Sequence, residues 1–351
     1  MSSKETKPSP SESTTEPGAL RRFFRRIDFS KGLAQFGVLV LIMLFFSVAE
    51  WLVTGRTSFS TSFNIIMMAS QASTIAIAAL GMTIIIIAGG IDLSVGTAIA
   101  LCGTVCAWFL REDYGAAVAI PLTLLTGVVC GAVNGMLISF LRVVPFIITL
   151  GTMSLFLGIG KLLSGSTTVR PDESSQVPHW LSNFATTSAD TTILGLPPGV
   201  WTLLAIAVLT YLFLRYSVFS RYIFALGSNE STARLCGINI PLTKIALYAL
   251  AGFFVGLAGM YQFSELSEGS PTDGVGLELK VIAAVVIGGG SLNGGRGTVQ
   301  GTLIGSYLIF VIDNGCTKIG LPNHLTDITL GVIIITAVAI DQWRQRRLER
   351  S

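Results

Sequence analysis

The sequence is short of charged residues. Asp, Glu, Lys and Arg together make up 12% of its 351 residues, whereas a soluble domain has roughly 25%. Hydrophobic residues make up 51%, and the mean hydropathy is +0.70. This composition excludes an ordinary soluble domain and predicts a polytopic membrane protein. The net charge of +3 is too small to indicate nucleic acid as a partner.

Residue patterns for catalysis and metal binding are also missing. The two histidines, His179 and His324, are far apart in predicted outside loops. No HExxH, CxxC or GxSxG motif occurs in a suitable setting. The five cysteines are an odd number and do not form a disulfide framework, so we interpret them as small packing residues. We expect no catalytic residue and no metal site.

One glycine-rich stretch invites a nucleotide-binding interpretation. From Gly290 to Gly297 the chain reads G-x-x-x-x-G-R-G. A phosphate loop needs Lys and then Ser or Thr at its end, to reach the phosphates and the magnesium ion. Arg296 and Gly297 occupy those positions, and no strand–helix alternation surrounds them. We therefore expect this chain to bind no ATP and to carry no fused ATPase domain.

What the sequence does contain is a series of apolar runs of membrane-spanning length. The first, 33–53, follows the basic stretch Arg21–Arg26. It is longer than a signal-peptide core and has no cleavage site after it, so we interpret it as a transmembrane helix. Nine further runs lie at about 63–90, 95–110, 116–140, 143–163, 200–216, 243–264, 278–291, 299–314 and 325–341. The predicted fold class is an all-α, polytopic transmembrane helical bundle with about ten spans.

The distribution of basic residues predicts that both termini are cytoplasmic. With ten spans, the basic segments fall on the same side as the N-terminus; they are the Arg142 loop, the Arg215–Lys244 loop, the Arg296 loop and Arg344–Arg350. Arg56 and Arg170 are exceptions. The resulting organisation is a polar, disordered tail at 1–30, a membrane domain at 31–343 and a basic tail at 344–351. The membrane domain has a cytoplasmic loop at 216–244 and an outside loop at 164–199.

Glycines recur at helical spacing in several of these runs. Repeats of four residues occur at Gly127, Gly131 and Gly135; at Gly297, Gly301 and Gly305; and at Gly252 and Gly256. Small residues let helix backbones approach closely in lipid, where no hydrophobic force drives helices together. The repeats predict a tightly packed bundle.

An acidic residue lies between the second and third apolar runs, in the motif Gly89, Gly90, Asp92, Leu93 and Ser94. The glycines indicate a tight reversal there. Asp92 is interpreted as a helix cap in this turn, with contact to a cytoplasmic partner or gate, and binding of substrate or a proton, as alternatives. A second glycine-rich reversal carries Gly294, Gly295 and Arg296.

The cytoplasmic loop contains a short helix signature, SNESTARLCGI. Ser228 or Asn229 is the expected N-cap, Glu230 falls in the first turn, and Gly237 is the expected C-cap. Leu235 offers an apolar contact. Such a helix suits docking of a soluble partner; an interfacial helix lying on the lipid surface is the alternative.

Four motifs in order resemble one family. The stretches GMTIIIIAGGIDLSVG, NGMLISFLRVVPFIITLGTMSLFLGIG, ALGSNESTARLCGIN and VIGGGSLNGGRGTVQGTLIG look like the permease subunits of bacterial ABC importers for ribose, xylose, arabinose and galactose. The resemblance covers about 35–341. It implies a multi-pass protein of the bacterial inner membrane that pairs with a second permease copy or paralogue. It also implies a partner ATPase, which holds the ATP and Mg²⁺, and an external sugar-binding protein.

The family's coupling segment matches at Gly227, Asn229, Glu230, Ala233, Arg234 and Gly237, with Leu235 beside it. The implied mechanism is that ATP-driven closure of the partner pushes Glu230 to Gly237 and reorients the bundle. A sugar needs a neutral polar path, for which candidates are Gln71, Ser73, Thr74, Asn134, Thr149 and Thr152. Each is equally suited to an interhelical hydrogen bond.

The outside loop 164–199 is a candidate docking site for the binding protein, through Trp180. The alternative function is a stand-alone secondary transporter or channel for a small polar solute. That class needs a buried acid or histidine within a span, and none is found at a convincing depth.

Overall fold

The computed structural model describes residues 29–172, 176–187 and 192–348, which fold as helices, turns and two isolated β-bridges. The helices are α2 Phe29–Thr54, α3 Ser62–Ile87, α4 Val95–Arg111, α5 Ala116–Leu141, α6 Pro145–Ser164, α7 His179–Ser182, α8 Pro198–Tyr216, α9 Val218–Ser228, α10 Glu230–Leu235, α11 Ile240–Leu266, α12 Leu277–Ile287, α13 Val299–Lys318 and α14 Asn323–Leu348. The all-α class is confirmed. Residues 1–28 and 349–351 lie outside the described ranges, so the disordered N-terminal tail stays a prediction.

Every predicted apolar run coincides with a helix. Six helices, α2, α3, α5, α6, α8 and α11, are long and apolar enough to cross a membrane. The two end boundaries differ from the prediction, because α2 already begins at Phe29 and α14 continues to Leu348. At the end of α14 the added residues include Gln, Arg and Leu, which are good helix formers despite the change from apolar to basic residues.

The predicted span at 278–291 is wrong as a full crossing. Helix α12 has 11 residues, about 16 Å of helix against a hydrocarbon core of about 30 Å. The non-helical segment 267–276 precedes it and runs along α4: a Cβ on Gly269 would lie 2.6 Å from the Cα of Thr104, and one on Gly274 would lie 2.9 Å from the Cβ of Ala100. The Gly- and Pro-containing sequence EGSPTDGVG does not sustain a helix, and its glycines fit against α4.

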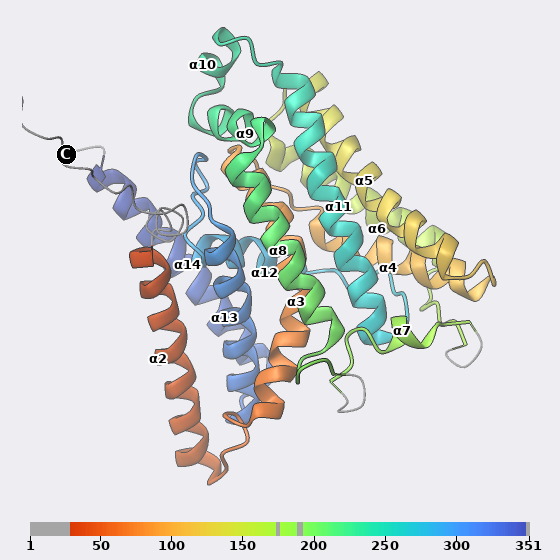
Figure 1. Ribbon diagram of the computed structural model, residues 1–351, viewed down its shortest axis with the longest axis vertical. Coiled ribbons are helices and arrows are strands. Elements are labelled where there is room, and N and C mark those ends of the chain that lie inside the picture. The colour runs from red at the N-terminus through yellow and green to blue at the C-terminus, as the bar shows by residue number, and fades with distance from the viewer. Residues whose placement is uncertain (1–28, 173–175, 188–191, 349–351) are drawn as a thin grey trace, which may run out of the picture.

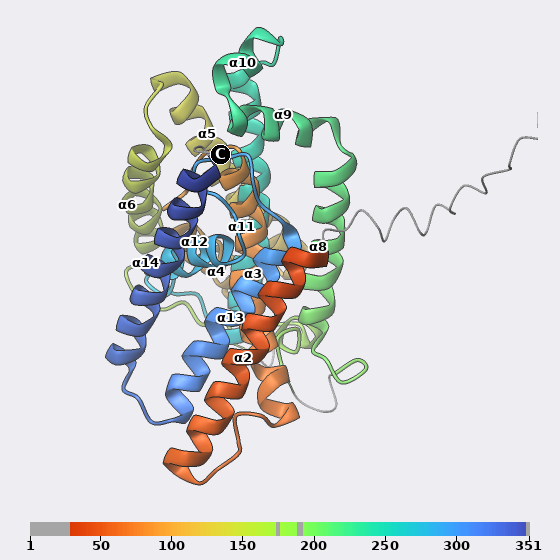
Figure 2. The same cartoon turned by 90° about the vertical axis from the view of Figure 1, so that its left-hand side faces the viewer.

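Helix α3 forms the centre of the bundle. It is buried along most of its length, in contrast to α2, which is largely exposed to the surroundings. Helices α2, α13 and α14 lie on one side of α3, and α4, α5, α6 and α11 lie on the other (Figure 1). The side with α2, α13 and α14 faces the viewer in Figure 2. The buried core is built from small and β-branched residues of α3 together with α4, α11 and α13.

The glycine repeats pack helix against helix, as predicted. A Cβ on Gly131 of α5 would lie 3.1 Å from the Cα of Gly252 in α11, and one on Gly127 would lie 2.5 Å from the amide nitrogen of Gly256. In the same way Gly305 of α13 packs against the end of α12: a Cβ on Gly305 would lie 3.0 Å from the amide nitrogen of Gly288. At these positions any side chain would push the two backbones apart.

Candidate functional site

The cytoplasmic loop predicted at 216–244 contains two helices instead of one. Helix α9 comes first and was not predicted. Its N-cap is Ser217, whose hydroxyl accepts a hydrogen bond from the amide of Ser220 at 3.0 Å. The sequence signal was present as Ser217 ahead of VFSRYIFALGS, but an 11-residue segment next to a spanning run reads as a continuation of that run.

Helix α10 forms where the sequence predicted it. The carboxamide oxygen of Asn229 accepts from the amide of Thr232 at 2.9 Å, so Asn229 and not Ser228 is the N-cap. The C-cap is Cys236, one residue earlier than predicted. Gly237 follows in the left-handed region at φ +84°, and its amide donates to the carbonyl of Arg234. Glycine is favoured at this position because it has no Cβ to clash.

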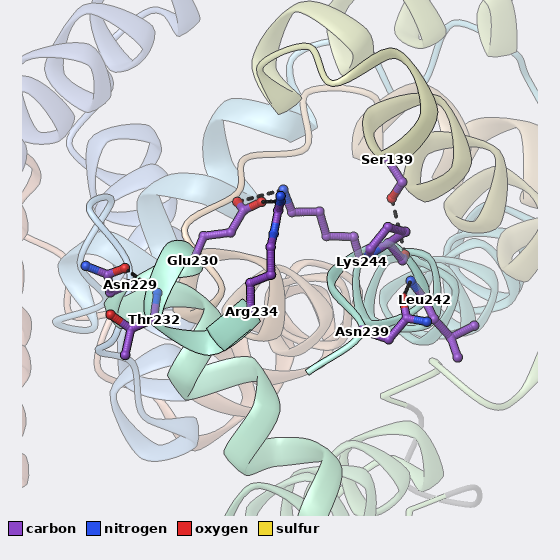
Figure 3. A network of polar contacts seen from close by, with 9 residues as sticks. Ser139, Asn229, Glu230, Thr232, Arg234, Asn239, Leu242 and Lys244 are labelled. Carbon is purple, nitrogen blue, oxygen red and sulfur yellow. Dashed lines mark hydrogen bonds and ion pairs between the residues drawn. The ribbon is translucent and has the colours of Figure 1, made fainter. Parts of the chain in front are cut away.

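Helix α10 projects from one end of the bundle (Figure 1). Ala233 faces inward and is buried, whereas the side chain of Leu235 is 88% exposed. Glu230 joins α10 to α11 through its Oε2, 2.8 Å from the Nζ of Lys244, and its Oε1 lies 3.6 Å from Arg234 (Figure 3). Such half-exposed ion pairs contribute little to stability, but they orient the helix and leave Leu235 free for a partner.

The segment just before α10 lies against both glycine-rich turns. A Cβ on Gly227 would overlap the carbonyl oxygen of Ile87 and would lie 2.8 Å from the amide nitrogen of Gly295. A Cβ on Gly294 would lie 3.1 Å from the Cα atoms of both Gly227 and Gly89. The structure therefore brings together the two predicted sets, the coupling segment and the hairpin motif, in one contact that we call the glycine junction (Gly89, Gly227, Gly294 and Gly295).

The two turns end their helices in the same way. The amide of Gly90 donates to the carbonyl of Ile85 at 3.0 Å, and the amide of Gly290 donates to that of Val285 at 2.8 Å. Each is preceded by a glycine in the left-handed region, Gly89 or Gly289. This is the Schellman termination of a helix. Arg296 closes the second turn, where its carbonyl accepts from the amide of Ser291 at 3.1 Å.

Asp92 is buried in the turn between α3 and α4, as predicted, but it is not the N-cap of α4. That position belongs to Ser94, which makes no side-chain cap. The Oδ1 atom of Asp92 accepts from the amide and the hydroxyl of Ser94 at 2.8 and 2.6 Å. The reason is geometric: a carboxylate two residues ahead of an amide closes a local Asx turn before the helix begins. Leu93 is half-buried beside it.

A second helix supports this carboxylate. The Nδ2 of Asn134 in α5 lies 3.4 and 3.3 Å from the two Asp92 oxygens and donates to the Ser94 hydroxyl at 2.8 Å. Asn134 Oδ1 and the Tyr248 hydroxyl, both buried, have no hydrogen-bond partner within the described residues. Asp92 thus fixes the turn to α5, which agrees with a structural role; the alternatives of gate contact and ligand binding stay open.

The predicted path residues are spread over three helices, α3, α5 and α6. Ser73 bonds to the carbonyl of Ala69 within α3, and Thr152 bonds to that of Thr149 within α6. Thr149 also donates to the carbonyl of Ile91, so it contacts the Asp92 turn from the far side. Thr74 is buried, and its hydroxyl has no hydrogen-bond partner among the residues that the structure describes; Gln71 is half-buried. Their role as a translocation path remains a prediction.

The described part of loop 164–199, which the sequence predicts to lie outside, is attached to the bundle. Val169 and Gly269 exchange two backbone hydrogen bonds, and Arg170 pairs with Glu268. Leu181 is buried in a separate apolar cluster. The side chains of Trp180 and Leu194, in contrast, are 55% and 88% exposed. The loop therefore presents an apolar outer surface on a fixed base.

Fold and site together define a polytopic helical membrane protein with a short exposed helix at one end. The family description "Branched-chain amino acid transport system / permease component" matches residues 64–338. The chain belongs to this family and is a multi-pass inner-membrane protein. No solved structure matches it.

Curated relatives cover most of its length. The ribose import permease protein of Escherichia coli (strain K12) is 35% identical over 95% of this chain and 100% of the relative. The fructose import permease protein of Rhizobium meliloti is 32% identical over 86% of this chain and 84% of the relative. The autoinducer 2 import system permease protein of Photorhabdus luminescens is 32% identical over 89% of this chain and 95% of the relative.

Proposed function

We propose that this chain is the permease subunit of an ATP-binding-cassette importer for a monosaccharide or related polyol. ATP is bound and hydrolysed on a separate ATPase subunit, which docks on α10. An external binding protein delivers the sugar to the opposite end. Family membership and relatives named for ribose, fructose and autoinducer 2 import support this class.

The observation that carries the proposal is the position of α10. Helix α10 is exposed, so a soluble subunit can bind it. Only Ser228 and Asn229 separate the start of α10 from Gly227 of the glycine junction. A push on α10 therefore acts on the turns that end α3 and α12. A tightly packed core transmits such a push as a rigid-body shift of helices rather than dissipating it.

The proposed topology has ten membrane segments with both termini on the ATPase side. Segment 267–276 and α12 together make one of these segments, in which only the second part is helical. Discontinuous segments of this kind line translocation sites in many transporters. A second permease copy or a paralogue completes the assembly, and no cofactor is assigned to this chain.

A substitution of Leu235 is a cleaner test than one of Glu230, because Glu230 has two cationic partners that orient α10. Leu235→Asp changes a side chain that is 88% exposed. Leu194→Asp is a matched control, with the same residue type and the same 88% exposure on the outside loop. Each variant is expressed with its ATPase subunit, and the co-purifying ATPase is measured after mild detergent extraction.

We expect Leu235→Asp to lose the ATPase and Leu194→Asp to retain it. If both variants retain the ATPase equally, α10 is not part of the interface with the ATPase, but the chain can still be an importer permease. If no ATPase co-purifies with the wild-type chain, and the pure chain moves sugar into liposomes without ATP, the secondary-transporter alternative is correct.

A further inference from the structure

We propose that the groove between the α5–α6 turn and the start of α11 binds the headgroup of an anionic phospholipid. The groove has a volume of about 760 Å³, within the roughly 300–1,000 Å³ of small-ligand sites. One wall is the turn at Arg142, Val143 and Val144, and the other is formed by α10 and the first turn of α11.

Charge is the first reason for an anionic occupant. Arg142, Arg234 and Lys244 line the groove with one carboxylate, Glu230. Both Glu230 oxygens already face cations, Lys244 at 2.8 Å and Arg234 at 3.6 Å. Arg142 is exposed and makes no ion pair with any carboxylate in the described part of the chain. An anion in the groove would meet an excess of positive charge.

The second reason is the depth of the groove in the membrane, which favours a lipid over a soluble anion as the occupant. The groove lies where three helices of spanning length end or begin: α5 at Leu141, α6 at Pro145 and α11 at Ile240. Beside it the apolar side chains of Phe140, Val144 and Phe146 are exposed. In a bilayer such side chains lie against acyl chains, so the cations next to them are at headgroup level. Basic pockets between spanning helices are typical sites for anionic headgroups.

The groove is also preformed. The hydroxyl of Ser139 donates to the carbonyl of Pro241 at 3.3 Å, which joins α5 to α11 across its floor. A Cβ on Gly135 would lie 2.7 Å from the Cα of Ile245, so the two helices touch just below. A site with fixed walls loses little entropy when it binds a ligand. The leaflet that the groove faces depends on the orientation given under the proposed function, but the binding of the lipid to the groove does not.

The test uses the purified full chain alone in a neutral maltoside detergent. Native mass spectrometry measures the dissociation constants of short-chain phosphatidylglycerol, short-chain phosphatidylcholine and glycerol phosphate. The main variant is Arg142→Asn, because Arg142 has φ +55° and asparagine tolerates the left-handed region. Arg142→Lys keeps the charge. Arg221→Asn removes an exposed arginine from α9, on the same side of the protein but outside the groove.

We expect phosphatidylglycerol to bind more tightly than both other probes. Arg142→Asn is expected to weaken its binding about fivefold, the effect of about 1 kcal/mol per cation near an anionic membrane surface. Arg142→Lys and Arg221→Asn are expected to stay close to wild type. Unchanged size-exclusion profiles confirm that the variants fold.

Three results would overturn the proposal. Equal weakening by Arg142→Asn and Arg221→Asn would mean general charge attraction. Glycerol phosphate binding as tightly as phosphatidylglycerol would mean a soluble-anion site. Unchanged lipid binding, with loss of the ATPase subunit from Arg142→Asn in detergent, would assign the groove to protein docking. Because the lipid assay contains no ATPase, its failure leaves the proposed function standing, and the Leu235→Asp test does not depend on it.

Discussion

The amide of Gly295 donates a hydrogen bond to the carbonyl oxygen of Ile87, with a nitrogen–oxygen distance of 2.8 Å. Ile87 is the last residue of α3, and Gly295 lies in the turn that leads into α13. Gly227 packs directly against this bond. Two helical hairpins that are distant in sequence are therefore joined at the point where the α9–α10 segment reaches them.

This junction predicts a variant that separates docking from transport. In Gly227→Ala the new methyl group must displace the Ile87 carbonyl or the Gly295 amide. We expect the ATPase subunit still to co-purify, because α10 is untouched, while sugar uptake falls by about 5- to 150-fold, the range of typical coupling free energies. Gly158→Ala is the control, since nothing lies within 4 Å of that position in α6. Normal uptake by Gly227→Ala would show that the junction transmits nothing.

Close packing of α5 on α11 predicts a loss of stability. Gly131→Ala forces a methyl group into a contact where the Cα of Gly252 is 3.1 Å away. We expect destabilisation of about 1–3 kcal/mol, as for other overpacked cores, measured as a lower melting temperature in detergent. Gly151→Ala, in open space on α6, is expected to leave the melting temperature unchanged or higher. Equal melting temperatures for the two variants would contradict the packing.

The Asp92 turn predicts strong coupling between two residues. Asp92→Ala leaves the Ser94 amide without its acceptor and leaves the Asn134 Nδ2 with the Ser94 hydroxyl alone, and Asn134→Ala removes a donor from the buried carboxylate. We expect each change to cost about 1–3 kcal/mol. The double variant should cost less than the sum by about 0.5–3 kcal/mol, as for residues in one network. Additive melting-temperature changes would show that the two side chains act independently.

A substitution of the exposed Trp180 in loop 164–199 is expected to weaken docking of the sugar-binding protein. Deleting 164–199 would remove Val169, Val177 and Leu181 and so expose the rest of their apolar cluster. A point change is therefore the sharper experiment. We expect Trp180→Asp to raise the binding-protein concentration needed for half-maximal uptake about tenfold, equivalent to roughly 1.4 kcal/mol of docking free energy.

The matched control for that experiment is Trp51→Asp. Trp51 is 58% exposed, close to the 55% of Trp180, but lies on α2 and away from the loop. ATPase co-purification should be unchanged in both variants. If the binding-protein concentration for half-maximal uptake shifts equally in Trp180→Asp and Trp51→Asp, or shifts in neither, Trp180 does not contact the binding protein.

The sequence by itself determined where the long helices lie and where α10 forms. Apolar length located the long helices, and Asn229, Glu230 and Gly237 located α10, because caps and hydrophobic runs act over a few residues. The four-residue glycine repeats likewise indicated close helix packing before any partner helix was known.

Tertiary structure decided which segments meet. Gly227 contacts Gly294 and Ile87, and Asn134 supports Asp92, through contacts between parts of the chain that are distant in sequence. It also kept 267–276 from extending α12 towards its N-terminus, because the glycines of this segment pack on α4 instead of adding helical turns. Local sequence patterns carry no information on such pairings, since backbone contacts between distant glycines depend on the shape of the whole bundle and leave no side-chain signature.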